Sequence, residues 1–117
     1  MLEKEFVVED KHSATQVGSG GLEVLSTPSM ISYMEAVAKE LIEPDLTTGQ
    51  TTVGIEVNVQ HLKGTPLGKT VKVTATLTEQ KKTILFYDVK AYQENELIGA
   101  GEHKRAIVEA NEFMENL

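Results

Sequence analysis

Residues 26–44 read STPSMISYMEAVAKELIEP, and their apolar side chains recur at the spacing of an amphipathic α-helix. Thr27 is expected to cap the first free N–H groups, Pro28 suits the first helical turn, and Pro44 ends the helix. The apolar positions are Met30, Ile31, Met34, Val37, Ala38, Leu41 and Ile42. They cover roughly half of the helix circumference, which predicts a helix wrapped by a sheet.

After this helix the apolar period changes to two, as is typical of β-strands. Valine and isoleucine alternate with polar residues over 53–59, on a parity that His61 shares, and apolar residues alternate again over 71–77. A loop at 62–69 and turns at 79–82 and 94–96 lead to further strands over 83–92 and 97–109. A short strand is predicted over 3–9, before a polar stretch at 11–21 that has too little apolar content for a core element. Within it, GSGG at 18–21 is interpreted as a mobile loop or flap.

This order of elements predicts a single α+β domain over residues 1–117, with an antiparallel sheet around one long central helix. The length suits one domain of about 100–150 residues, and such a small chain has little room for a deep cavity. The edge strands of the sheet also need protection. We therefore expect a homodimer whose sheets pair across a twofold axis, with any sizeable ligand site involving the second subunit.

The charge and the composition exclude several classes of function. Eighteen acidic residues stand against 11 basic ones, and the net charge of −7 argues against nucleic acid as a partner. The absence of cysteine excludes disulfides, thiolate metal sites and cysteine nucleophiles. The N-terminus has no signal-peptide pattern, and no apolar run approaches the roughly 18 residues of a membrane helix. We expect a cytoplasmic protein that acts without a membrane or a metal.

Few side chains remain for proton transfer. His12 and His103 fall in polar or charged runs and are expected to be solvated. His61 ends a strand on the buried parity, where its imidazole needs a partner, so that a structural and a catalytic role are both open. Glu35 lies at the rim of the apolar helix face, which suits a base, although an ion pair with Lys39 is the alternative.

Three segments together resemble the hotdog-fold thioesterases of the fluoroacetyl-CoA thioesterase type. They are LSTPSMI at 25–31 followed by Glu35, TVGIEVNVQHL at 52–62, and TPLG at 65–68. The segment LIGAGEHKRA at 97–106 is similar to the last strand of that family. The resemblance implies a hotdog fold and hydrolysis of an acyl-CoA thioester, with CoA as part of the substrate and no separate cofactor.

The resemblance also implies roles for individual residues. Thr27, Glu35 and His61 match the catalytic set of the family, and Gly54 and Arg105 match its substrate-contacting glycine and arginine. A threonine at a helix N-terminus suits a developing oxyanion as well as a cap. Glu35 is the expected central carboxylate, either as a nucleophile that forms an anhydride or as a base that activates water, with His61 as an acid-base partner or oxyanion donor.

The composition of the predicted flap argues against a substrate with a fluorinated acyl group. Residues 17–21 hold no aromatic side chain to gate a fluorinated acyl group, so a short-chain or other acyl-CoA is expected. Arg105 is expected near the CoA phosphates, and the looser candidates there are Lys63, Lys69, Lys81 and Lys82. A non-catalytic acyl-CoA binding or sensing domain is the alternative. An enoyl-thioester hydratase is disfavoured, because residues 28–43 contain no His or Asp.

Overall fold

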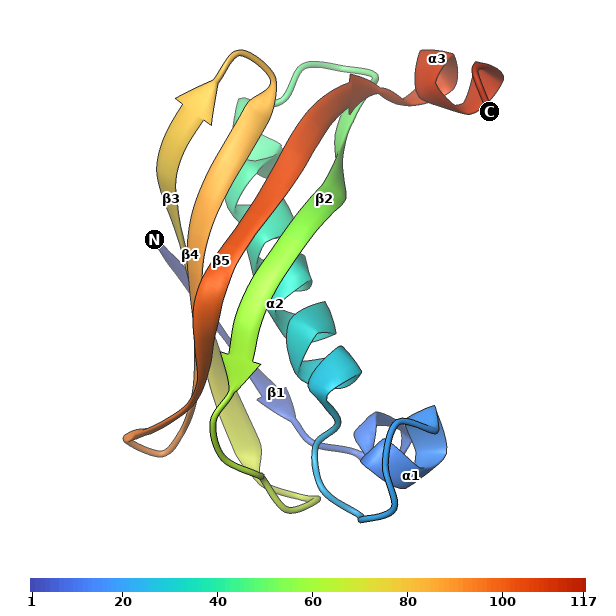
Figure 1. Cartoon of the computed structure of the whole chain (residues 1–117). Helices are drawn as coiled ribbons and strands as arrows, with labels where there is room; N and C mark the ends of the chain where they lie inside the picture. Colours follow the sequence, from blue (N-terminus) through green and yellow to red (C-terminus); the bar gives the residue numbers. More distant parts are fainter.

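The computed structural model describes residues 1–117 and confirms the predicted architecture, in which a five-stranded antiparallel sheet curves around one long helix (Figure 1). The strands are β1 (Leu2–Val7), β2 (Gln50–His61), β3 (Thr70–Lys81), β4 (Ile84–Gln93) and β5 (Glu96–Glu109). The helices are α1 (Ala14–Val17), α2 (Thr27–Ile42) and α3 (Ala110–Glu115), with 3-10 turns at Asp10–His12 and Glu43–Asp45. The strand order β1-β3-β4-β5-β2 leaves β1 and β2 as the edges.

The hydrophobic core lies between α2 and the concave face of the sheet. Met30, Met34, Val37 and Ala38 of the helix are at most 1% exposed, as the helical period predicts. Alternate residues of the central strands meet them, namely Val71, Val73, Ala75, Leu85, Tyr87, Val89 and Ala91. The helical period of α2 and the period of two in the strands therefore direct apolar side chains into the same core. This packing fixes the position of the helix on the sheet along its length.

The start of α2 differs from the expectation by one residue. Ser26, and not Thr27, is the N-cap, and its hydroxyl oxygen accepts a hydrogen bond from the Ser29 N–H at 3.1 Å. Thr27 is the first residue of the helix and Pro28 the second. Both Ser26 and Thr27 have the chemistry of a cap, so composition alone does not choose between them. The consequence is that the Thr27 hydroxyl is free for another partner.

The polar N-terminal stretch contains regular structure ahead of the predicted flap at 18–21, which itself lies in no helix or strand. A 3-10 turn at Asp10–His12 leads directly into α1, whose N-cap Ser13 accepts from the Gln16 N–H at 3.2 Å. His12 was expected to be solvated, but it is half-buried, and its Nδ1 lies 2.8 Å from the Tyr33 hydroxyl of α2. These are capping and side-chain bonds, which apolar periodicity does not detect. The segment is tied to the helix on which the site is built.

Strand β2 departs from strict alternation. The pairing register with β5 shifts between Gly54 and Glu56, which is a β-bulge at Ile55. Gly54 pairs with Arg105 before the bulge and Val57 pairs with His103 after it, so both residues lie on the helix side of the sheet. The predicted buried parity is therefore wrong ahead of the bulge. Ile55 is 51% exposed at the sheet edge.

The C-terminal end adds one element that the sequence reading did not predict. Strand β5 ends at Glu109, and α3 follows and projects away from the sheet (Figure 1). None of its residues is buried. None of the helices combines the length and the apolar character needed to cross a membrane.

The contact between β2 and β5 depends on Gly101. A Cβ atom at this position would overlap the Asn58 carbonyl oxygen and the Val59 Cα of the neighbouring strand. We predict that Gly101→Ala lowers the free energy of unfolding by about 1–3 kcal/mol, because the two strands must move apart. Urea unfolding measures this change. Gly64→Ala is the control, since no atom lies within 4 Å of its added Cβ, and equal midpoints for the two variants would contradict the steric argument.

Candidate active site

The end of β2 meets the start of α2 in a direct side-chain contact. His61 is the last residue of β2 and Thr27 the first of α2, and the Thr27 Oγ1 lies 2.8 Å from the His61 Nδ1. Burial lowers the pKa of His61 below its usual 6.5, with an opposing contribution from the Lys63 backbone. The imidazole is therefore neutral at pH 7. Its Nε2 is buried and has no hydrogen-bond partner in the chain.

A hollow of about 320 Å³ lies beside this pair. Its walls come from α1, from the segment before α2, and from the loop after β2, and they include Ala14, Ser19, Val24, Leu25 and Gly64. Small and apolar side chains dominate the lining. Lys63 stands at this hollow, and its Nζ is paired with Glu96 at 2.7 Å. The Thr27 hydroxyl and the His61 imidazole are the groups of this hollow that can carry acid-base chemistry.

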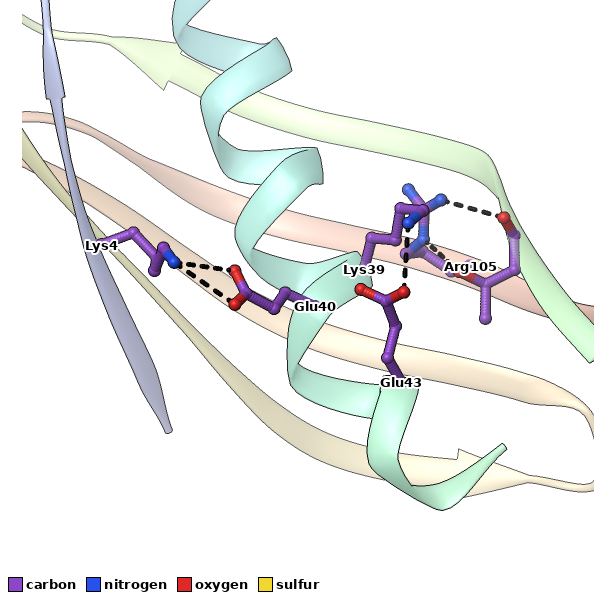
Figure 2. A network of polar contacts seen from close by, with 6 residues as sticks. Lys4, Lys39, Glu40, Glu43 and Arg105 are labelled. Atoms are coloured by element: carbon purple, nitrogen blue, oxygen red, sulfur yellow. Dashed lines mark hydrogen bonds and ion pairs between the residues drawn. The ribbon is translucent and has the colours of Figure 1, made fainter. Parts of the chain in front are cut away.

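Glu35 lies two helical turns further along α2 and pairs with Arg105. The Glu35 Oε2 is 3.4 Å from an Nη1 of Arg105, and a Cβ on Gly54 would overlap the same carboxylate oxygen. The alternative pair of Glu35 with Lys39 is not formed, because Lys39 reaches Glu43 at 3.3 Å (Figure 2). Gly54 thus gives the Glu35 carboxylate room to lie against the strand and meet the guanidinium.

Arg105 is itself buried, with 5% of its surface exposed. Its Nε donates to the Thr52 Oγ1 at 2.9 Å and its Nη2 donates to the Thr52 carbonyl at 3.2 Å, as the bonds toward β2 in Figure 2 show. The guanidinium therefore lies between α2 and the sheet and not on a surface rim. This corrects the expectation that Arg105 faces the CoA phosphates.

His103 also differs from the expectation, since it is 1% exposed and not solvated. Its Nε2 lies 3.2 Å from the Arg105 Nη1, and its Nδ1 lies 2.8 Å from the Glu56 carbonyl oxygen. Strand alternation explains the error, because His103 and Arg105 share the inner face of β5 while their charged neighbours Glu102 and Lys104 face outward. The period of two within this charged run is the signal that reveals its buried members.

The structure thus brings the site residues together in two groups. Thr27 and His61 form one group, and Gly54, Glu35 and Arg105 form the other. Thr27 and Glu35 are eight residues apart on one helix, which places them about 12 Å apart along its axis. Gly54 and His61 are seven residues apart on β2, a span of about 23 Å. Glu35 therefore does not reach the Thr27–His61 pair of its own chain.

No group of three or more His, Cys, Asp or Glu side chains is arranged to hold a metal ion. The two groups of residues offer instead a neutral imidazole, a hydroxyl, a carboxylate and a buried guanidinium. This set suits hydrolysis of an activated carbonyl compound, which needs a base or nucleophile and donors for the oxyanion.

Comparison with known sequences places this set of residues in a family. The model of the FlK family, described as fluoroacetyl-CoA-specific thioesterase, matches residues 8–111. The fluoroacetyl-CoA thioesterase of Streptantibioticus cattleyicolor is 34% identical over 91 residues, which cover 78% of this chain. The same alignment spans 66% of that relative, just under two thirds of its length.

Solved structures agree in fold. A variant of the fluoroacetyl-CoA-specific thioesterase, in complex with fluoroacetate and CoA, superposes with a TM-score of 0.94 at 28% identity, covering 99% of this chain and 95% of that one. A thioesterase superfamily member from Thermus thermophilus gives 0.89 at 25% identity, covering 97% and 85%. A hot-dog-like protein from Thermanaerovibrio acidaminovorans gives 0.90 at 22%, covering 98% and 85%, and supports the fold alone.

These likenesses confirm the hotdog fold of the chain. The matched range of 8–111 takes in Thr27, Gly54, His61 and Arg105 as well as Glu35. The chain therefore belongs to the FlK family of fluoroacetyl-CoA-specific thioesterases, which are thioester hydrolases.

Proposed function

We propose that this protein is an acyl-CoA thioesterase whose active site is completed by a second copy of the chain. Thr27 and His61 come from one protomer, and Glu35 comes from the partner subunit. The observation that carries the proposal is the 2.8 Å contact between the Thr27 Oγ1 and the His61 Nδ1 beside the hollow. The separation of Glu35 from this pair within one chain is the reason for the second subunit.

The edge strand β2 supplies a surface for this assembly. Ile55 and Val57 are 51% and 38% exposed there, and an exposed apolar edge strand is a template for pairing with another chain. Antiparallel pairing of two β2 strands around a twofold axis at Asn58, with the bulged Ile55 left unpaired, sets Gly54 opposite His61 of the partner subunit. Since Gly54 lies against Glu35, each Glu35 then faces the threonine and histidine of the other protomer.

The assembled residues account for the hydrolysis. The thioester carbonyl is polarised by N–H groups at the start of α2 and by the Thr27 hydroxyl. Glu35 is the central carboxylate: it attacks the carbonyl to expel CoA and leave an anhydride that water cleaves, or it removes the proton of an attacking water. His61, neutral through burial, accepts the proton that the water gives up, directly on the first route and from Glu35 on the second, and passes it to the CoA thiolate. The products on either route are the free acid and CoA.

The lining of the hollow indicates which acyl group the substrate carries. The walls of the hollow carry small side chains, and residues 17–21 have no aromatic ring to close over a fluorinated group. We therefore propose short-chain acyl-CoAs as substrates. Arg105 donates two N–H groups to Thr52, one to His103 and one to Glu35, which leaves one Nη2 N–H unused, and we propose that Arg105 and Gly54 contact the acyl group.

The first prediction concerns turnover. Purified protein incubated with a panel of acyl-CoAs from acetyl upward is expected to release free thiol, fastest with short acyl groups. Glu35→Gln and His61→Ala are each expected to lower kcat by about 100-fold or more, because each removes a proton-transfer group. Tight binding of acyl-CoA without thiol release would support a non-catalytic sensing domain. Full activity in both variants would overturn the catalytic assignment.

The second prediction tests whether the site is shared between subunits. Co-expression of Glu35→Gln with His61→Ala is expected to restore roughly a quarter of wild-type activity, because half of the dimers are mixed and each holds one intact site. Thr27→Ala with His61→Ala is the control, and we expect no restoration, because both residues belong to the same half of each site. No recovery in the first pair would place Glu35 and His61 in one protomer.

The third prediction concerns pH. Only the neutral imidazole of His61 accepts a proton, and burial lowers its pKa below 6.5. We therefore expect kcat/KM to hold its plateau on the acidic side until the pH is below 6.5 and to fall as His61 becomes protonated. A stopped assay over pH 4.5–8, with the His61 ring titrated by NMR, measures both curves. A histidine-linked midpoint above 6.5 is incompatible with a desolvated ring.

A further inference from the structure

A buried polar cluster lies between Glu35 and the sheet and contacts the Glu35 carboxylate through Arg105. It consists of Thr52, His103, Arg105 and the carbonyl of Glu56, and its three side chains are at most 5% exposed. We propose that His103 is a positioning residue, which links the bulge of β2 to the Arg105 guanidinium and so fixes that guanidinium on Glu35. The proposal rests on the proposed role of Glu35 in thioester hydrolysis.

The two partners of His103 determine its protonation state. The Glu56 carbonyl can only accept a hydrogen bond, so the His103 Nδ1 at 2.8 Å must carry a proton and donate it. An arginine N–H can only donate, so the Nε2, 3.2 Å from Arg105 Nη1, must be bare and accept. Only the neutral ring protonated at Nδ1 makes both bonds. His61 differs, because its hydroxyl partner can donate or accept.

The bulge gives His103 its anchor on β2. A bulge adds a residue to one strand and disrupts the ladder there, which leaves backbone groups to find other partners. The Glu56 carbonyl, directly after the inserted Ile55, finds the imidazole of the neighbouring strand. Burial, with a smaller contribution from the Arg105 charge, lowers the pKa of His103, against the Glu56 hydrogen bond and the Glu35 charge. The ring is therefore neutral at pH 7.

The guanidinium needs this acceptor to point at Glu35. Thr52 fixes one edge of Arg105 through Nε and Nη2. The other nitrogen, Nη1, has two neighbours: Glu35 at 3.4 Å, the longest of the contacts, and His103 at 3.2 Å. Without the His103 Nε2, a half-exposed carboxylate is the sole partner of Nη1. The Arg105 guanidinium then loses one of the two contacts that orient Nη1 toward Glu35. Misplacement of a group at an active site by about 1 Å can lower the rate of catalysis about 100-fold.

Two substitutions separate the two bonds. The Asn amide nitrogen in His103→Asn replaces Nδ1 and keeps the donor to Glu56, but offers Arg105 no acceptor. The Gln amide in His103→Gln extends to the place of Nε2 and supplies an acceptor to Arg105, while losing the Glu56 bond. We expect kcat to fall about 10- to 100-fold in His103→Asn with KM within about threefold, and His103→Gln to keep kcat within about fivefold of wild type.

Stability measurements separate positioning from folding. Glu102→Gln, at an exposed site on the opposite face of β5, is the control and is expected to match the wild type. Urea unfolding is recorded for all four proteins, since both His103 variants lose one buried hydrogen bond. A fall in kcat that is equal in the two variants, or that follows their loss of stability, would overturn the positioning role.

A second readout does not need turnover. The ¹⁵N spectrum of histidine-labelled wild-type protein is expected to show His103 neutral and protonated at Nδ1 between pH 6 and 8. A proton on Nε2, or a charged ring at pH 7, would refute the link to Arg105 whatever the activity. If the wild-type protein releases no thiol from any acyl-CoA, the proposed function is wrong, and the predicted effect of His103 on kcat is wrong with it.

Discussion

A positive charge carried into the space between a sheet and a helix must find acceptors, because water no longer provides them. Arg105 is in this position, and the surroundings of the guanidinium are arranged to meet its demand. Thr52 offers both its hydroxyl and its carbonyl, His103 offers a ring nitrogen, and Glu35 offers the countercharge. Removal of one acceptor leaves part of a buried charge without a partner, so these residues act as one unit.

This demand explains features of β2 that are otherwise unconnected. Gly54 lacks a side chain because the Glu35 carboxylate occupies that space. The bulge at Ile55 changes the facing of the strand, so that Thr52 and Gly54 point at Arg105 while Val57 and His61 still lie on the helix side. The same strand therefore serves the guanidinium at one end and the Thr27–His61 contact at the other.

The sequence predicted the parts of the fold that depend on repetition. The helical period over 30–42 and the period of two over 71–77 predicted α2 and β3, whereas the strand order β1-β3-β4-β5-β2 became visible only in the folded chain. The resemblance named Thr27, Glu35 and His61, but it did not show that Glu35 lies apart from the other two in one chain. That separation follows from the lengths of α2 and β2, which only the folded chain makes visible.

The errors have local physical causes. Ser26 and Thr27 are both good caps, and the choice depends on a single hydrogen bond to Ser29. The bulge in β2 is a property of its pairing with β5, so the letters of β2 alone do not reveal it. His103 was predicted to be solvated because it stands between Glu102 and Lys104, and the charge of these neighbours suggested that the whole run is exposed. Each of these errors concerns which way one side chain faces.

The segment between α1 and α2 is held by main-chain hydrogen bonds at both ends. The Ala14 N–H donates to the Val24 carbonyl, the Ser26 N–H to the His12 carbonyl, and the Leu25 N–H to the Thr65 carbonyl. None of these bonds uses a side chain, so residues 21–23 can change in identity while their anchors persist, whereas Gly18 is required by its left-handed backbone at φ +86°. Selection for a new acyl group can therefore act on this loop alone. In the proposed enzyme, the Thr27–His61 pair and the loop that lines the hollow beside it can therefore evolve at different rates.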